Sequence, residues 1–541
     1  MGRITLLMAI GLSVGSLFGQ HQHGDSSAGR RAELLAGMGS HSHPIATKSE
    51  LAQTFFDQGL ALLYGFNHDE AARLFARAAE LDPESPMPHW GIAYALGPNY
   101  NLPAMPEREE KAWEAIAKAV VLAKRAPAGE QAYVAALAQR YSKDPKADRK
   151  ALGERYAEAM GEVMRRFPDD LDAATLYAEA KMDLRPWQLW TAEGEPAPGT
   201  LEICAVLEGV LRRNPMHPGA NHYYIHAVEA STQPERALPS AERLGALTPG
   251  AGHLVHMPSH IYSRIGEFEK AAKVNELASE VDRQYVARSG AQGMYPLAYY
   301  SHNLHFVAYS RMMQGRYQDA REYAQRLRKN VAGAIDGMPM LGAYAAYEWL
   351  VLVRFEKWEE MTKQATPTEK DLFLRAMYLY AQGAALAATG KAEEAEKWQG
   401  MIKAITKEVP AEAVAMFNPA KQVLALASMD LGARIARSRG EKSLEVEQWK
   451  LAVELEDGLS YMEPPDWYYP TRESLGRALL RHGRAEEAEG VFRKDLEKNP
   501  RNGRSLAGLL ESLRVQQKGE SVALVEKEFR EAWRRADSPA H

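Results

Sequence analysis

The sequence predicts an all-helical solenoid, a row of paired helices stacked on one another. His222 and His226 recur as His256 and His260, each 34 residues later. A period of 34 residues is typical of a repeat made of two helices. Apolar residues recur at spacings of three and four, and no alternating strand pattern accompanies them. We therefore expect one all-α chain built from helix pairs.

The first 19 residues predict a secretory signal. Arg3 precedes an apolar run from Ile4 to Val14, and small residues continue to Gly19. This run is too short to span a membrane, and no later run is long enough to do so. We expect an exported protein, periplasmic or secreted, with no membrane span in the mature chain.

Residues 20–48 predict a flexible leader. They are polar and small, and they contain two His-x-His pairs, His21 with His23 and His41 with His43. Such pairs can scavenge free metal, but solvated low-complexity sequence is the interpretation we prefer here.

Regular structure is expected from Ser49. The first repeat carries bulky, small and terminating residues at Phe55, Gly59, Ala71, Phe75, Ala78 and Pro83. In this spacing the chain resembles a tetratricopeptide repeat (TPR) protein, which implies a right-handed superhelix of helix-turn-helix repeats. We expect an N-terminal TPR solenoid with histidine-rich repeats over residues 49–338. A C-terminal TPR solenoid with closing helices is expected over residues 339–541, with a soft joint near Pro339.

Composition limits the partners and the kinds of site. The 541 residues include 71 acidic and 66 basic side chains, for a formal charge of −5. This balance gives no reason to expect nucleic acid or an anionic membrane as a partner. Cys204 is the only cysteine, which excludes an internal disulfide and a thiolate-rich metal site.

The histidines are concentrated and in phase with the repeat. Seven of the sixteen lie between residues 222 and 305, where even spreading would place about 2.5. If the small residue of each second helix (Ala237, Ala271 or Ala320) is numbered 20, the seven occupy positions 2, 5 and 9 of the first helix. These positions lie within about 60° of one another on a helix. The TPR resemblance implies that they line the concave groove. The seven are His222, His226, His253, His256, His260, His302 and His305.

A transition-metal site is the interpretation we favour for this stripe. Glu229 follows His222 and His226 on the same helix face. Neutral imidazole with carboxylate is a ligand set for copper, iron or zinc, which the sequence does not distinguish. The His-Glu-x-x-His motif of zinc proteases is absent. Whether the protein is an enzyme stays open, with a metal-dependent oxidoreductase as one possibility.

Two other functions are kept as alternatives. One is a non-catalytic scaffold whose groove binds a peptide or protein. The other is metal storage or delivery, which requires fast exchange of the ion. For His68, His89, His217 and His482 we prefer a packing role, because a single histidine on a helix is more often a packing residue than a ligand.

Further polar and aromatic residues are candidates for substrate contact or for support of the ligands. Glu179 and Asp183 fall on the same face of the preceding repeat, and Arg185 and Trp187 follow at that helix end. Near the C-terminus an aromatic segment suits a ligand platform or, equally, a packed plug between repeats. The remaining candidates are Tyr262, Glu463, Trp467, Tyr468 and Arg472.

Several strings resemble a family of exported, largely uncharacterised bacterial TPR proteins. They include FDQGLALLYGFNHDEAARLF, MDLRPWQLW, HPGANHYYIHAVEAS, GAGHLVHMPSHIY and EPPDWYYPTRESLG. The resemblance spans nearly all of the mature chain. It supports the repeat fold and export, and it implies no particular activity.

Overall fold

The computed structural model describes residues 31–540 and confirms the all-α class. Within this range the β-type pairings are isolated bridges, such as Trp190 with Pro196. The helices follow one another as antiparallel pairs of the TPR type. The predicted signal at 1–19 and the start of the predicted leader lie outside the described residues.

The described chain forms two compact units. The N-terminal unit comprises residues 31–261 and 277–295, and the C-terminal unit comprises 262–276 and 296–540. Pro339, where we expected a joint, lies inside the C-terminal unit. Val331, Ile335 and Leu341 around it are fully buried, so this connection belongs to a core. The predicted joint therefore does not coincide with the division between the units.

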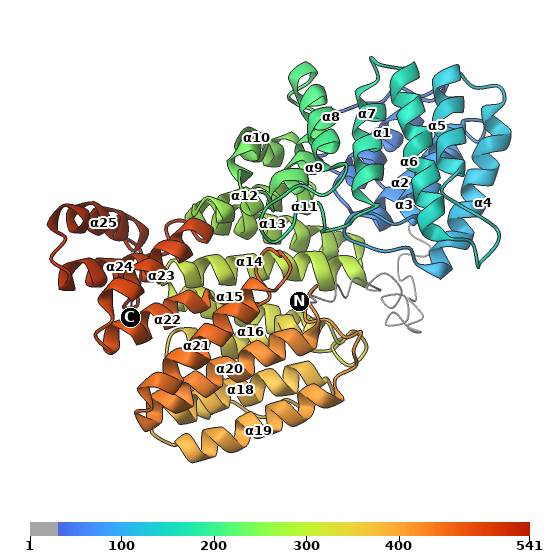
Figure 1. Cartoon of the computed structure of the whole chain (residues 1–541). Coiled ribbons are helices and arrows are strands. Elements are labelled where there is room, and N and C mark those ends of the chain that lie inside the picture. The colour runs from blue at the N-terminus through green and yellow to red at the C-terminus, as the bar shows by residue number, and fades with distance from the viewer. Residues whose placement is uncertain (1–30, 541) are drawn as a thin grey trace, which may run out of the picture. The chain divides into compact units, whose positions relative to one another are not determined.

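The N-terminal unit is a succession of paired helices, shown from blue to green in Figure 1. Its helices α1 to α8 span mostly 11 to 18 residues. They are α1 (Glu50–Tyr64), α2 (His68–Leu81), α3 (Pro86–Leu96), α4 (Pro106–Ala123), α5 (Ala128–Ala138), α6 (Arg149–Arg166), α7 (Leu171–Met182) and α8 (Thr200–Arg213). After them come α9 (Pro218–Val228), the 3₁₀ turn η2 (Pro234–Ala237), α10 (Leu238–Leu247) and α11 (Gly252–His256). The chain passes between the units within α12 (Pro258–Arg264) and α13 (Phe268–Ser289).

The first pair shows why the predicted residues form a TPR unit. Ser49 caps α1 by accepting a hydrogen bond from the Ala52 amide at 3.2 Å, which satisfies a free N–H of the first turn. The Phe75 ring of α2 fills the space left by two glycines, since a Cβ on Gly59 or Gly91 would lie 2.7 or 2.6 Å from it. The small and bulky residues of the repeat therefore interlock as predicted.

Residues 31–48 are irregular but not free, which corrects the prediction of a flexible leader for this part of the chain. The Leu35 amide donates to Gln58 at 2.8 Å, and the Gly250 amide donates to the Gly37 carbonyl at 2.8 Å. His43 donates its amide to Asp57 at 3.1 Å. Composition indicated solvated chain, but these side chains and amides find fixed partners on the helices of the N-terminal unit.

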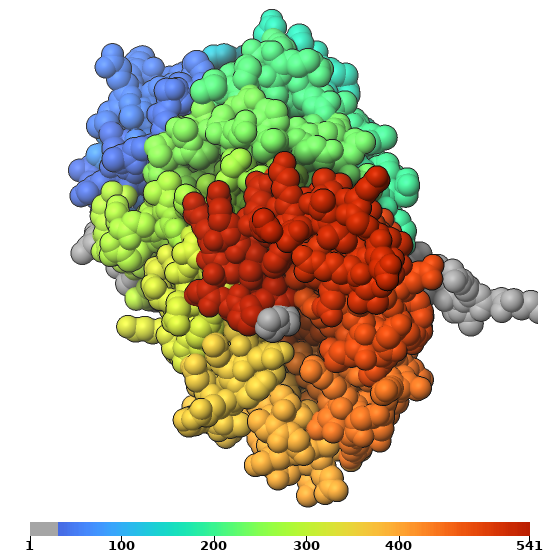
Figure 2. Space-filling view, turned by 90° about the vertical axis from the view of Figure 1, so that its left-hand side faces the viewer, coloured from blue at the N-terminus to red at the C-terminus, as the bar shows by residue number. Residues whose placement is uncertain are grey.

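The C-terminal unit contains the later repeats and the closing helices. After the π-helical turn η3 (Tyr295–Tyr299) it consists of α14 (Tyr300–Met313), α15 (Tyr317–Val331), α16 (Leu341–Arg354), α17 (Trp358–Thr362), α18 (Leu372–Ala388), α19 (Ala392–Glu408), α20 (Ala420–Arg439), α21 (Lys442–Asp457), α22 (Thr471–Arg481), α23 (Ala485–Lys498), α24 (Gly503–Val515) and α25 (Gly519–Ala532). In the space-filling view the closing helices, in red, pack beside the orange helices of the same unit (Figure 2). Among residues 31–540, no helix combines the length and the apolarity needed to cross a membrane.

Candidate metal centre

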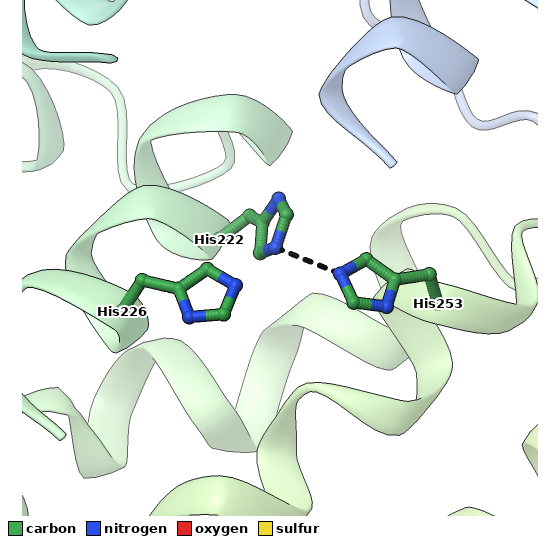
Figure 3. A group of neighbouring side chains, drawn as sticks. All are labelled: His222, His226 and His253. Carbon is green, nitrogen blue, oxygen red and sulfur yellow. Dashed lines mark hydrogen bonds between the residues drawn. The ribbon is translucent and has the colours of Figure 1, made fainter. Parts of the chain in front are cut away.

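Five of the predicted histidines lie together in the core of the N-terminal unit. His222 and His226 are one turn apart on α9, and His253 and His256 belong to α11. His260 is on α12. One ring nitrogen from each of His222, His226 and His253 lies within 4.8 Å of the other two. Figure 3 shows these three rings converging from α9 and α11.

The second histidine repeat is not one continuous helix. The sequence predicts a single helix through His253, His256 and His260, but α11 ends at His256 and α12 begins at Pro258. Proline has no N–H to continue the hydrogen-bond ladder, so it starts a new helix well and continues an old one poorly. Across this break the Nε2 atoms of His256 and His260 lie 2.9 Å from each other.

Fixed acceptors set the tautomers of three histidines. His222 Nδ1 lies 2.6 Å from the Tyr64 carbonyl oxygen, and His226 Nδ1 lies 2.7 Å from Glu229 Oε1. His260 Nδ1 contacts the other carboxylate oxygen of Glu229. A carbonyl or carboxylate can only accept, so each Nδ1 carries the proton and each Nε2 presents a lone pair. This is the arrangement in which histidine binds metal ions in proteins.

The Nε2 atoms of these buried histidines face the interior of the cluster. His226 Nε2 is buried and has no hydrogen-bond partner among residues 31–540. His222 Nε2 lies 3.2 Å from His253 Nε2. Two nitrogen ligands of a tetrahedral ion, each at 2.0–2.1 Å from it, are about 3.3 Å apart. The separation of His222 and His253 is that of a hydrogen bond between the two rings, and it is also close to that of two ligands of one ion.

The cluster is buried, which corrects the expectation that these histidines line an open groove. His222 and His256 are 0% exposed, and His253 is 3% exposed. Phe66, in the turn between α1 and α2, stacks on His253 at 5.4 Å and meets the edge of His222 at 4.6 Å. Tyr100 lies 5.1 Å from the His226 ring and Trp187 5.6 Å from it. Aromatic rings thus cover the stripe and exclude water.

Burial controls the charge of the cluster. It lowers the pKa of His222, His226 and His253, and the neighbouring histidines lower the pKa of His222 and His253 further. These imidazoles are therefore neutral, the form that binds metal. Burial opposes ionisation of Glu229, but its interactions with His260 and His226, including a hydrogen bond to each, lower its pKa to about 2.

Glu229 is consequently a buried anion whose ion-pair partners are histidines. It is 1% exposed, and within residues 31–540 its ion-pair partners are His226 and His260, with no lysine or arginine. A buried charge is costly unless it is paired. A divalent ion beside these histidines would compensate the carboxylate.

His302 and His305, also predicted as ligands, belong to the C-terminal unit. His302 lies on α14, where its ring meets Phe306 edge to face at 5.1 Å. His305 packs between Tyr344 and Tyr347, at 5.4 and 4.2 Å between ring centroids. Burial lowers the pKa of His305 to about 3. His305 is thus a neutral core residue among tyrosines, and a ligand role for His302 stays a prediction.

Glu179 and Asp183 form a separate buried group in the N-terminal unit. Tyr94 donates to Glu179, and Arg140 donates to Asp183 at 2.7 Å. Burial raises the pKa of both carboxyl groups, against the charge of Arg140, and the charge of Glu179 raises that of Asp183 further. One arginine facing two acids favours a single negative charge shared between them. Neither acid hydrogen-bonds to a histidine of the cluster.

Arg185 and Trp187 differ in their placement. Arg185 is exposed, which does not fit a role in the buried centre. Trp187 adopts a left-handed backbone conformation at φ 60°, and this turn directs its ring toward His226. Trp187 therefore contacts a histidine of the cluster, while the side chain of Arg185 is exposed, and a functional role for either residue stays a prediction.

The C-terminal aromatic segment is a packed plug. Trp467 and Tyr468 are 1% and 0% exposed, and the Tyr468 hydroxyl lies 2.8 Å from that of Tyr380. Arg472 donates to Asp457 at 2.8 Å. Of the two interpretations left open by the sequence, the ligand platform is therefore wrong for these residues, because their rings and charges are used inside the C-terminal unit.

Two more candidates are buried in the same unit. Glu463 is 5% exposed and Tyr262 is 7% exposed. Lys270 lies over the Tyr262 ring, 5.4 Å from its centroid. Neither is positioned as an accessible substrate contact.

The sequence reasoning missed the aromatic cover and a second polar cluster. Tyr64 and Phe66 contact the histidines through the turn after α1, and no local pattern marks them. His41 and His217 converge on Asp172, although we assigned His41 to a flexible leader and His217 to packing. The spacing His-x-His and the segment His217–Pro218 were the available signals.

Comparisons with known proteins find distant structural neighbours and give no function. No protein-family model matches the sequence, and no curated protein matches it. Among solved structures, a human IFIT1 dimer with m7Gppp-AAAA is 13% identical with a TM-score of 0.36, over 90% of this chain and 91% of that chain. Yeast Tom70 is 12% identical with a TM-score of 0.28, over 90% and 93%. The TPR domain of P58(IPK) is 11% identical with a TM-score of 0.23, over 87% and 99%. Likeness at this level transfers neither a partner nor a site.

Proposed function

We propose that this protein is a metalloprotein that holds a transition-metal ion between His222, His226 and His253. The observation that carries the proposal is the set of fixed tautomers. Nδ1 of His222 and of His226 each faces an acceptor, so their Nε2 lone pairs are left for another group. For His226 no such group is found among residues 31–540.

The pair His256 and His260 is a second position for an ion beside the first. Their Nε2 atoms lie 2.9 Å apart, and Glu229 contacts both His226 and His260. The carboxylate thereby orients one ligand of each position. We propose that the cluster holds one ion, or two that share Glu229 as their common orienting group.

The neutral imidazole ligands limit the choice of metal ion to transition metals that bind imidazole. Copper, iron and zinc all bind such sites. Copper or iron would give the protein redox activity, whereas zinc has no redox chemistry. An oxidoreductase therefore requires that the bound ion be copper or iron.

The burial of the histidines distinguishes a metal centre of this kind from the alternative functions. His222, His226 and His256 are 0–1% exposed, which favours a slowly exchanging ion over storage or delivery. The other alternative is a scaffold that binds a peptide or protein partner along its repeats. Such a protein would bind its partner equally well with and without metal.

Metal analysis tests the proposal directly. Protein purified without an affinity tag is compared by elemental analysis with the variants His226→Ala and His253→Ala. We expect near-stoichiometric copper, iron or zinc in the wild type and its loss in both variants. His89→Ala is the matched control, because His89 is a buried histidine of the same unit outside the cluster.

Circular dichroism of each variant shows whether the helices are retained. Equal metal content in the wild type and both cluster variants would contradict the proposal. So would a wild-type protein that contains no metal and takes none up on refolding with copper, iron or zinc. The partner-binding alternative would then be the function to pursue.

We also propose export, on the basis of residues 1–19 alone. Cell fractionation followed by N-terminal sequencing tests it. Mature protein in the periplasm or medium, beginning near residue 16 or 20, is the expected result, and full-length protein confined to the cytoplasm would contradict it.

A further inference from the structure

A second cluster of metal-ligand side chains is centred on Asp172, in the first turn of α7. His41 Nε2 lies 2.9 Å from Asp172 Oδ1, and His217 Nε2 lies 3.1 Å from the same oxygen. The two imidazole rings are 4.7 Å apart between centroids. One ligand atom from each of the three residues lies within 4.8 Å of the others. Two histidines and one carboxylate thus converge on one point.

The cluster faces a cavity, in contrast to the buried histidines of α9 and α11. His41, Asp172 and His217 line a cavity of about 940 Å³. The His41 and Asp172 side chains are 13% and 10% exposed, while that of His217 is 1% exposed. An ion bound here would have protein ligands on one side and the cavity on the other.

The surroundings hold the carboxylate in place. Asp172 Oδ2 lies 2.9 Å from His43 Nδ1, so this oxygen is already engaged by another histidine. Tyr64 donates its hydroxyl to Oδ1. Oδ1 therefore meets His41, His217 and Tyr64 at once, and it is the oxygen nearest the two imidazole nitrogens.

We propose that His41, Asp172 and His217 bind a second, exchangeable transition-metal ion at the wall of this cavity. Two imidazole nitrogens with one carboxylate oxygen form a ligand set that leaves positions open to solvent or a small ligand. The open side of the cluster fits a site of this kind, whereas structural sites are closed by protein ligands. The inference does not depend on the buried centre.

One hydrogen bond changes when the ion binds. His217 Nδ1 accepts from the Ala220 amide at 3.1 Å and so caps α9, which places the ring proton on Nε2 facing Asp172. Coordination through Nε2 moves that proton to Nδ1 and gives up the cap. In return the ion joins His41, from the segment before α1, to α7 and to the start of α9.

Metal binding would therefore fix the segment of residues 31–48 to the helices of the N-terminal unit. Residues 31–48 are irregular, and the proposed ion would attach them to two helices through His41. Zinc should therefore slow proteolysis within this segment, and this gives a readout that is independent of any activity.

The experiment is a zinc titration of the full-length protein after dialysis against a chelator, by calorimetry, with element analysis before the titration. The wild type should bind one exchangeable zinc ion beyond the metal retained in the core. His41→Ala should weaken this binding by at least about 100-fold, since even residues that only support a ligand contribute 10- to 100-fold. The control is His89→Ala, which removes a buried histidine of the same unit that belongs to neither cluster, and it should bind zinc within about threefold of the wild type.

Three results would overturn the inference. They are zinc binding unchanged in His41→Ala, loss of zinc binding in His89→Ala, and absence of an exchangeable site in the wild type. Because His41→Ala leaves the α9 and α11 histidines intact, the metal retained before titration reports on the buried centre separately.

Discussion

At the scale of single residues, Glu229 determines the chemistry of two histidines. Its two oxygens contact the Nδ1 atoms of His226 and His260, and this fixes the orientation of both rings, with the proton of each on Nδ1. Because the carboxylate is 1% exposed, the arrangement is maintained without competition from water. We regard Glu229 as an orienting group for the ligands, although the sequence suggested it as a ligand itself.

The first prediction concerns Glu229→Gln. A glutamine oxygen can accept from one imidazole, but its NH₂ group faces the other, whose proton must then move to Nε2. One ligand is lost in consequence, and we expect metal affinity to fall by about 10- to 100-fold with helicity retained. Competition with a chromophoric chelator measures the affinity. Glu208→Gln is the control, since Glu208 contacts Tyr224 and Arg236 instead, and equal affinity in both variants would contradict the orienting role.

The second prediction concerns the pH dependence of stability in the C-terminal unit. Burial and the charge of Glu473 raise the pKa of Asp495 to about 6, against hydrogen bonds from Ser505, Asn499 and Asn502. The folded pKa lies above the unfolded value of 3.8. The resulting stability is thus fully present below pH 3.8 and is lost as the pH rises through 6.

Asp495→Asn removes this titration. Relative to the wild type, the variant should gain of the order of 3 kcal/mol in free energy of unfolding between pH 4 and pH 8. Urea unfolding at these two pH values measures the difference. A difference between wild type and variant that is constant with pH would show that Asp495 titrates normally.

At the scale of elements, the turn between α1 and α2 closes the metal centre. Phe66 takes a left-handed backbone conformation at φ 54°, which is unfavourable for a bulky residue. Its ring is 1% exposed and contacts His222, His226 and His253. The turn thus holds an aromatic cover over the cluster.

The third prediction is that Phe66→Ala opens this cover. Loss of the ring should destabilise the fold by about 3–5 kcal/mol. It should also increase the rate at which a chelator removes the metal by about tenfold or more. Each 1.4 kcal/mol lost from the free energy of local opening raises the population of the open state about tenfold. Phe75→Ala is the control, since it removes an equally buried ring elsewhere in the unit. Equal release rates in the two variants would argue against the cover.

The helices themselves could be predicted because their signals are local. The interlocking of Gly59 with Phe75 follows from residues within one repeat, and so does the phase of the histidine stripe. Pro258 was a sequence signal for the break between α11 and α12, but the repeat period predicted one continuous helix. The burial of the stripe was not readable, because Phe66 and Tyr100 reach it from other repeats.

At the scale of the whole molecule, the N-terminal unit contains both the histidine cluster of α9, α11 and α12 and the cluster at Asp172. The sequence identified the histidines of α9 and α11 because the repeat brings them into phase. It did not identify the cluster at Asp172, because His41, Asp172 and His217 come from three distant segments with no shared period. Contacts of that kind depend on how the repeats stack, which no spacing in the sequence records.

The fourth prediction concerns the stability of the N-terminal unit. An ion that binds only the folded state stabilises it by about 4 kcal/mol at a thousand times its dissociation constant. Protein unfolded with a chelator and refolded without metal should therefore lose hydrogen-exchange protection in α9 and α11. Peptides from α18 and α20 in the C-terminal unit serve as the internal reference. Uniform loss across both units, or none, would contradict a local metal centre.

The most direct measurement of the central claim is anomalous diffraction at the absorption edge of whichever metal the purified protein contains. The account predicts a peak in the core of the N-terminal unit, about 2.0–2.2 Å from ring nitrogens of His222, His226 and His253. A metal-containing crystal with no peak among these histidines, whose rings instead hydrogen-bond only to one another, would contradict it.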